Sequence, residues 1–192
     1  MANDEIGALR IIGLRGGTAS EIVGFLTDLD RAYRVLYRLD FRISVILPER
    51  LIDEADSFSP YATFGRRAFA SEEPIQPEYR LRVSKVRIES PGFWEVVGSL
   101  NVLETLRKYL NDRDERRKDK EYRESAERRK LDLENEDLLN RVLEGRIKLL
   151  KTLGIPDATI RQMIWTEYGV PFTRLGDHQD SGLVHCEART AR

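Results

Sequence analysis

Residues that could bind a metal ion or transfer a proton gather near the carboxyl end of the sequence. Every kind of zinc ligand occurs among Asp177, His178, Asp180, His185 and Cys186. Their spacing contains no C-x-x-C pair and no two histidines four residues apart, so it matches no established zinc site. The chain has only two histidines and one cysteine, all in this segment, so no Ser-His-Asp or Cys-His set is favoured. We therefore predict a protein that is not an enzyme, with no catalytic residue, no cofactor and no metal site.

A glycine-containing turn is the next place where a ligand could bind. Gly13, Gly16 and Gly17 follow a short apolar run and precede Thr18, the position at which phosphate-binding loops lie in nucleotide-binding folds. The turn lacks both the G-x-G-x-x-G order and the lysine of a P-loop. We interpret it as a plain connection between a strand and a helix. A head domain that binds a small ligand or nucleotide and so controls assembly remains one alternative.

The segment from Leu131 to Leu153 has the pattern most typical of association between chains. Its apolar residues recur with the alternating four- and three-residue spacing of a short coiled coil. The predicted oligomerisation positions are Leu131, Asn135, Leu138, Val142 and Leu149. Asn135 would set the register from a core position. The alternative is that the next helix folds back over the same face, but the apolar surface is too wide for one short helix, so we favour self-association.

The sequence LGIPDATIRQMI, from Leu153 to Ile164, resembles the turn and second helix of bacterial helix-turn-helix domains. In those domains a glycine turn precedes a helix whose exposed residues enter the major groove of DNA. The resemblance implies Thr159, Arg161 and Gln162 as the residues that would contact bases. A dimeric DNA-binding regulator is therefore the alternative function, with nucleic acid as a less favoured partner.

The charge of the chain is high but balanced. Its 192 residues include 32 Lys and Arg and 33 Asp and Glu, which argues against a strongly basic nucleic-acid-binding module. The acidic start of the sequence has no signal-peptide pattern, and no apolar run is long enough for a membrane helix. We expect a cytoplasmic protein with no membrane partner.

The amino-terminal part contains both helical and strand patterns. A short apolar run over 9–14 predicts a first strand. Thr18 and Glu21 have the spacing of a capping box, and apolar residues at helical intervals follow as far as Tyr37. Alternation of apolar and polar residues over 41–47 then predicts a second strand.

A long connection and a third strand come next. Residues 48–78 are rich in Pro, Ser, Asp and Glu, which is typical of a connection. Alternation over 79–88 predicts the third strand, and the phase of the pattern slips before Val86, which indicates either a bulge or a change in which face is buried. A helix is predicted from Pro91, with a break near 98–101.

These elements together predict an α+β protein: a small three-stranded head, a long charged helix with a short coiled coil, and a carboxyl-terminal helical hairpin. The expected domains are a head over 1–110, the charged helix and coiled coil over 111–153, a short helix over 154–170 and a mobile tail over 171–192. The favoured function is a non-enzymatic scaffold or adaptor. It would form a homo-oligomer and present its head to a protein partner whose identity the sequence does not give.

Overall fold

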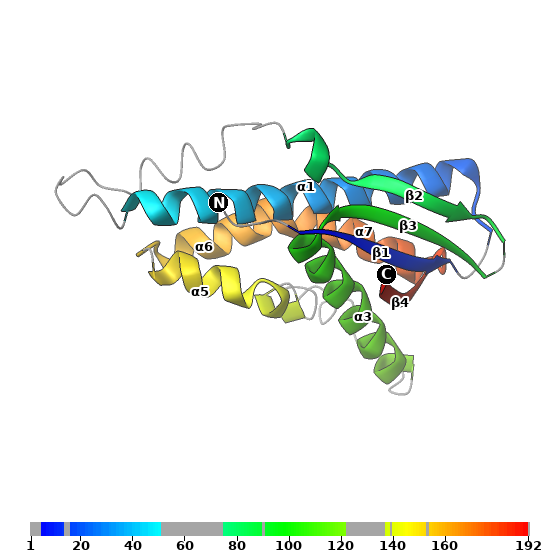
Figure 1. Cartoon of the computed structure of the whole chain (residues 1–192). Coiled ribbons are helices and arrows are strands. Elements are labelled where there is room, and N and C mark those ends of the chain that lie inside the picture. The colour runs from blue at the N-terminus through cyan, green and yellow to red at the C-terminus, as the bar shows by residue number, and fades with distance from the viewer. Residues whose placement is uncertain are drawn as a thin grey trace.

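A four-stranded antiparallel sheet and the helices packed against it form the described part of the chain (Figure 1). The structure is a computed structural model that describes residues 5–13, 16–50, 75–89, 91–121, 137–138, 140–152 and 154–191. For residues 42–50, 116–121 and 185–191 within these ranges, it describes the backbone only. The fold is of the α+β class, as the sequence predicts.

The sheet has the strand order β2-β3-β1-β4, and each strand is antiparallel to its neighbours. The strands are β1 (Ile6–Gly13), β2 (Arg82–Arg87), β3 (Gly92–Ser99) and β4 (Val184–Ala191). β1 and β2 are parallel to each other, as are β3 and β4, so a helical crossover joins each of these pairs. This is the split β-α-β order, with the second crossover enlarged by several helices.

One face of the sheet holds the hydrophobic core. Leu9 and Ile11 of β1 pair with Val96 and Trp94 of β3, and all four residues are buried. Helix α1 (Ala19–Arg50) covers this face, since the ring of Phe25 lies 5.2 Å from that of Trp94 between centroids. We call this the inner face. The alternate residues of each strand project from the opposite, outer face.

The amino terminus of α1 confirms the predicted capping box. The backbone N–H of Thr18 donates to the Glu21 carboxylate at 2.8 Å, and the backbone N–H of Glu21 donates to the Thr18 hydroxyl at 3.2 Å. The predicted apolar stripe is also confirmed, because Phe25, Leu29 and Tyr33 are fully buried. Local capping and the burial of one face therefore both specify this helix.

The helices that follow β3 share the core of the sheet. They are α3 (Leu100–Glu121), α5 (Glu144–Thr152), α6 (Asp157–Met163), the π-helical turn η2 (Ile164–Gly169) and α7 (Val170–Asp180), while the short turn η1 (Pro77–Tyr79) precedes β2. Leu106, Leu150 and Phe172 belong to the same hydrophobic cluster as Leu9 and Val96. The core is therefore continuous from the sheet to these helices. Among the described residues, no helix has the length and apolar character needed to cross a membrane.

The strand predicted over 41–47 is wrong, because α1 continues through Arg50. No Gly or Pro occurs between Phe25 and Leu47, so the chain has no helix-breaking residue in this stretch. A helix that has formed its first turn gains one hydrogen bond for each residue it adds. The alternating pattern alone therefore does not end the helix.

The helix predicted from Pro91 is also wrong, because residues 92–99 form β3. Gly98 explains part of this outcome: a Cβ atom there would lie 2.7 Å from the Tyr33 hydroxyl oxygen, so this strand must pass very close to α1. The predicted break over 98–101 coincides with the junction between β3 and α3.

The predicted mobile tail over 171–192 is wrong. Helix α7 and strand β4 occupy this segment, and β4 pairs with β1 at the centre of the sheet. Burial of Phe172, Leu175, Leu183 and Val184 provides the physical reason, since these four apolar residues are removed from water. The head is consequently completed by residues far beyond its predicted end at residue 110, and its sheet has four strands instead of three.

The bulge predicted before Val86 is confirmed. The pairing of β2 with β3 shifts register between Val83 and Lys85, which leaves Ser84 as the additional residue. Val83 pairs with Val96 and Val86 pairs with Trp94, both on the inner face. The bulge therefore keeps two valines that are three residues apart on the same side of the sheet.

The hydroxyl of Tyr33 joins α1 to two other elements. It accepts a hydrogen bond from the backbone N–H of Ser99 at 2.7 Å and donates one to the backbone carbonyl of Tyr79 at 2.5 Å. Tyr33 is fully buried. Its hydroxyl thus satisfies a buried backbone donor at the end of β3 and fixes the segment that leads into β2.

We predict that Tyr33→Phe lowers the free energy of unfolding by about 1–3 kcal/mol, because it leaves a buried backbone N–H without its acceptor. Urea denaturation followed by circular dichroism measures this change. Tyr79→Phe, at a half-buried ring whose backbone makes the contact, is the matched control and should have a smaller effect. Equal stability of wild type and Tyr33→Phe would contradict this role.

Candidate functional site

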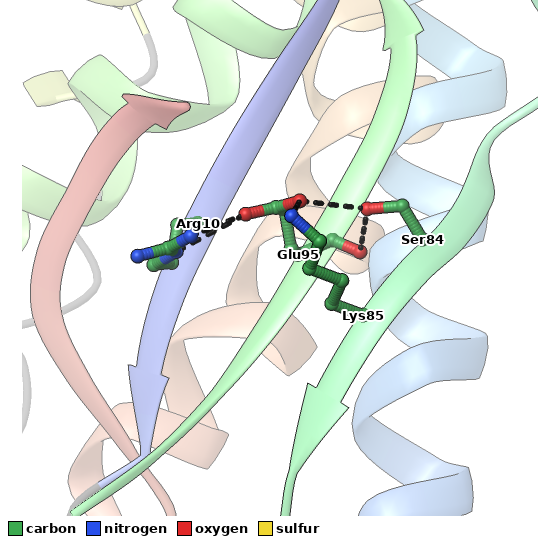
Figure 2. A network of polar contacts seen from close by, with 4 residues as sticks. All are labelled: Arg10, Ser84, Lys85 and Glu95. Carbon is green, nitrogen blue, oxygen red and sulfur yellow. Dashed lines mark hydrogen bonds and ion pairs between the residues drawn. The ribbon is translucent and has the colours of Figure 1, made fainter. Parts of the chain in front are cut away.

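A network of charged and polar side chains crosses three strands on the outer face of the sheet (Figure 2). Glu95 of β3 lies between Arg10 of β1 and Lys85 of β2 in the strand register. Its carboxylate accepts two hydrogen bonds from the Arg10 guanidinium, at 2.6 and 3.2 Å. On the other side it accepts one from the Ser84 hydroxyl at 3.1 Å and lies 3.4 Å from the Lys85 ammonium.

Exposure differs sharply within this network. The Glu95 side chain is 7% exposed, whereas those of Arg10 and Lys85 are 40% and 65% exposed. The Arg10 guanidinium also lies over the ring of Phe93, 4.5 Å from its centroid. The network therefore consists of one buried acid that holds two more exposed cations in place on the outer face.

The Arg10 guanidinium is the main reason why the pKa of Glu95 is lowered from its ordinary value. Burial opposes the shift by disfavouring the charged form, while Ser84 and Lys85 add to the lowering. A carboxyl group whose pKa is lower in the folded state stabilises the fold above its unfolded pKa. That stabilisation is lost as the pH falls through the folded pKa.

A cleft of about 630 Å³ lies between α5 and α6. Its lining combines apolar and charged residues of both signs, namely Asp137, Asn140, Arg141, Glu144, Ile147, Lys151, Asp157, Ile160, Arg161 and Ile164. The ion pair of Lys151 with Asp157, at 3.1 Å, joins its two helices. The mixture of charges gives the cleft no clear preference for an anion or a cation.

The residues implied by the helix-turn-helix resemblance lie on α6. Thr159, Arg161 and Gln162 are all exposed there, while Ile160 is buried. Arg161 also borders the cleft, where acidic residues share the lining. Those acids would repel the phosphates that Arg161 attracts.

The predicted coiled-coil positions have different environments. Leu131 and Asn135 lie outside the described residues. Leu138 is 1% exposed within the core of its own chain, and Val142 is partly buried against that core. Leu149 is 39% exposed, the most exposed of the three predicted positions that the structure describes. Helices α1 and α6 both contact α5, so part of the predicted seam is covered within the chain.

The π-helical turn η2 presents an exposed tryptophan. Trp165 is 54% exposed, and Val170, five residues later, is 50% exposed. The Trp165 ring lies over Gly169, where an added Cβ would be 3.3 Å from the ring. π-Helical turns are rare and often occur at functional sites. Sequence patterns based on 3.6 residues per turn do not reveal such a turn.

The candidate zinc ligands on α7 make contacts with other elements instead. His178 lies 3.0 Å from the Asp28 carboxylate, and Asp180 forms an ion pair with Arg113 at 2.6 Å. Burial raises the pKa of Asp177, although Arg113 opposes that effect. Among the described residues, no group of three or more His, Cys, Asp or Glu is placed to hold a metal ion.

The glycine turn before α1 already has an anion at the start of the helix. The Glu21 carboxylate accepts hydrogen bonds from both the backbone N–H and the hydroxyl of Thr18. A phosphate at this position would have to compete with that carboxylate. Gly16 is exposed, and Arg15 lies outside the described residues. The ligand-binding alternative stays a prediction.

Comparison with protein-family models, with curated proteins and with solved structures finds no match for this chain.

Sequence reasoning missed the network around Glu95. The signal was present, because Glu95 is the one charged residue within the apolar run GFWEVVG. An acid in such a run must either face water or find a cation. A helix over this segment, as the sequence predicts, places Glu95 on a solvated surface and therefore does not require a cation partner.

We predict that Glu95→Gln lowers the free energy of unfolding by about 1–3 kcal/mol at pH 7, because it removes the charged acceptor shared by Arg10 and Lys85. The difference from wild type should begin to narrow as the pH falls below 4.5, the ordinary pKa, because the unfolded wild-type chain then takes up a proton at Glu95, and it should vanish below the lowered pKa of the folded state. Urea denaturation at several pH values measures both effects.

The matched control for this experiment is Glu89→Gln. Glu89 forms an ion pair with Arg87 in which both side chains are more than half exposed. Its removal should change the stability little, because solvent screens such pairs. A difference between wild type and Glu95→Gln that does not vary with pH would contradict the role given to the Glu95 charge.

Proposed function

We propose that this protein is a non-enzymatic adaptor that associates with a second copy through its carboxyl-terminal helices and presents the α+β head to a protein partner. The observation that carries this proposal is the pair of large exposed apolar side chains on η2 and at the start of α7, Trp165 and Val170. Tryptophan is among the residues that contribute most to protein interfaces, because it offers a large and rigid apolar surface.

Trp165 and Val170 lie on the same side of the chain. Five residues correspond to slightly more than one turn of a π-helix, so the two side chains are neighbours at the junction of η2 and α7. Gly169 lies between them and has no side chain, so the Trp165 ring can lie close to the backbone of Gly169. The pair therefore forms a local apolar surface with a preset ring position.

Leu149 supports the same proposal from α5. It belongs to the predicted seam and is 39% exposed, whereas the adjacent Leu150 is 1% exposed and anchors the helix in the core. Leu138 has the same anchoring role, since it is 1% exposed. Self-association through this helix therefore uses its outward residue, while the buried leucines hold the helix on the head.

We predict that Leu149→Lys and Trp165→Ala each shift the chain from a multimer toward the monomer mass, because each removes apolar surface that a second copy would cover. Light scattering on a sizing column, over a range of protein concentrations, measures the mass. Both positions are exposed, so the head should keep its fold and its circular dichroism spectrum.

The matched controls are Thr152→Lys on α5 and Thr166→Ala on η2, both at exposed polar positions of the same elements. They should keep the wild-type mass. A wild-type chain that is monomeric at every concentration would contradict the self-association part of the proposal.

A second candidate, a dimeric DNA-binding regulator, is favoured by the exposure of Thr159, Arg161 and Gln162 together on α6. This candidate predicts binding to duplex DNA that weakens steeply with salt and is lost in Arg161→Ala without a change in mass. Fluorescence anisotropy with labelled duplex DNA measures this binding. Equal affinity of wild type and Arg161→Ala for duplex DNA would exclude α6 as the helix that contacts the bases.

A further inference from the structure

We propose that the free edge of β2 binds an extended segment of the partner protein, in which apolar and acidic residues alternate. This inference rests on the proposed adaptor function, because it specifies the chemistry of the protein partner that would bind the head. The added segment would extend the sheet by one strand through backbone hydrogen bonds. Three features of β2 support it: its position in the sheet, its exposure, and the different chemistry of its two faces.

β2 is an edge strand with one paired side. Its neighbour is β3, and in the described ranges of the chain no further strand pairs with it. All six of its residues are exposed. An edge strand of this kind presents a row of backbone N–H and C=O groups on which another strand can assemble. The other edge strand, β4, differs because it packs against α3 and α7.

The two faces of β2 would select the side chains of an added strand. On the inner side Val83 and Val86 are each 47% exposed, and Ile88, just past the strand, is 65% exposed. On the outer side the register places Arg82 beside Val97 and Arg87 beside Phe93. Directly opposite residues of paired strands interact, so apolar residues are favoured next to the valines and an acid next to Arg82, whereas Arg87 already forms an ion pair with Glu89.

A second copy of this chain fits this edge poorly. In a symmetric antiparallel pairing of two β2 strands centred on Ser84 and Lys85, Arg82 of each copy would lie opposite Arg87 of the other. Like charges directly opposite each other in a sheet are destabilising. The charge pattern of β2 therefore favours an acidic partner segment over self-pairing.

Single-stranded nucleic acid also fits the outer face poorly. Arg10 and Lys85 already contact the Glu95 carboxylate, which would repel a phosphate group. The Phe93 ring is covered on one side by the Arg10 guanidinium, so it is not freely available for base stacking. A peptide strand avoids both difficulties, because it binds at the edge and leaves the Glu95 network intact.

The test uses the full chain and a fluorescent, end-capped peptide of about seven residues in which valine and glutamate alternate, long enough to span β2. Fluorescence anisotropy measures its binding. We expect at least about tenfold tighter binding than for the same peptide with lysine in place of glutamate, and a weaker preference at high salt. A version with proline at alternate positions, which lacks backbone donors, should not bind.

Arg82→Glu is the variant that tests the location. It reverses a charge at an exposed position on β2, and it should reduce binding of the glutamate peptide and increase binding of the lysine peptide. Arg174→Glu, at an exposed position on α7, changes the net charge equally and should leave both unchanged. Both variants should keep the wild-type circular dichroism spectrum.

Other outcomes would overturn the inference. If no peptide binds, the charges of β2 serve only to prevent aggregation at an edge strand. If amide protection of β2 in the protein alone rises with protein concentration, a second copy occupies the edge. If a labelled single-stranded oligonucleotide binds and Arg82→Glu abolishes that binding, the ligand is nucleic acid. Peptide binding does not depend on whether the chain is a monomer or a multimer. A failure of the peptide experiment would therefore not contradict the self-association proposal, which the mass measurement tests separately.

Discussion

Closure of the sheet by the last strand of the chain is the constraint on which the rest of the structure depends. β1 pairs on one side with β3 and on the other with β4, so its backbone is hydrogen-bonded on both sides, while its inner-face residues Leu9 and Ile11 are buried in the core. This pairing requires the helices between β3 and β4 to return to the sheet. They do so by sharing its hydrophobic core, as Leu150 and Phe172 demonstrate.

The same constraint explains where the protein can interact. The core lies on the inner face, so polar residues can occupy the outer face. There the Glu95 carboxylate contacts Arg10 and Lys85 and so links three strands (Figure 2). Because β1 takes β4 as its second neighbour, β2 stays at the edge of the sheet in the described part of the chain, and all six of its residues are exposed. Packing of α5 and η2 through their buried residues leaves Leu149 and Trp165 at the surface. The two surfaces that we propose for interaction therefore belong to different elements of one fold.

Local signals in the sequence were sufficient for some elements and insufficient for others. The capping box at Thr18 and the bulge beside Val86 depend on residues a few positions apart, and both were predictable. The β3 strand and β4 depend on pairing with β1, which is distant in the sequence, and neither was recognised. Of the candidate site, Leu149 was predicted, but the Glu95 network and the Trp165 turn were not. The first required knowledge of strand neighbours, and the second required a helical geometry with more than 3.6 residues per turn.

Binding of a partner strand, as we propose it, requires an open edge on β2. Amide hydrogen exchange of the full chain, resolved by residue with NMR, tests this most directly, because amides without a hydrogen-bonded acceptor exchange faster than paired ones. We expect slow exchange along β1, which is paired on both sides, and fast exchange at those β2 amides that point away from β3. Protection of all β2 amides to the level of β1 would contradict it, since the edge would then already be covered in the free protein.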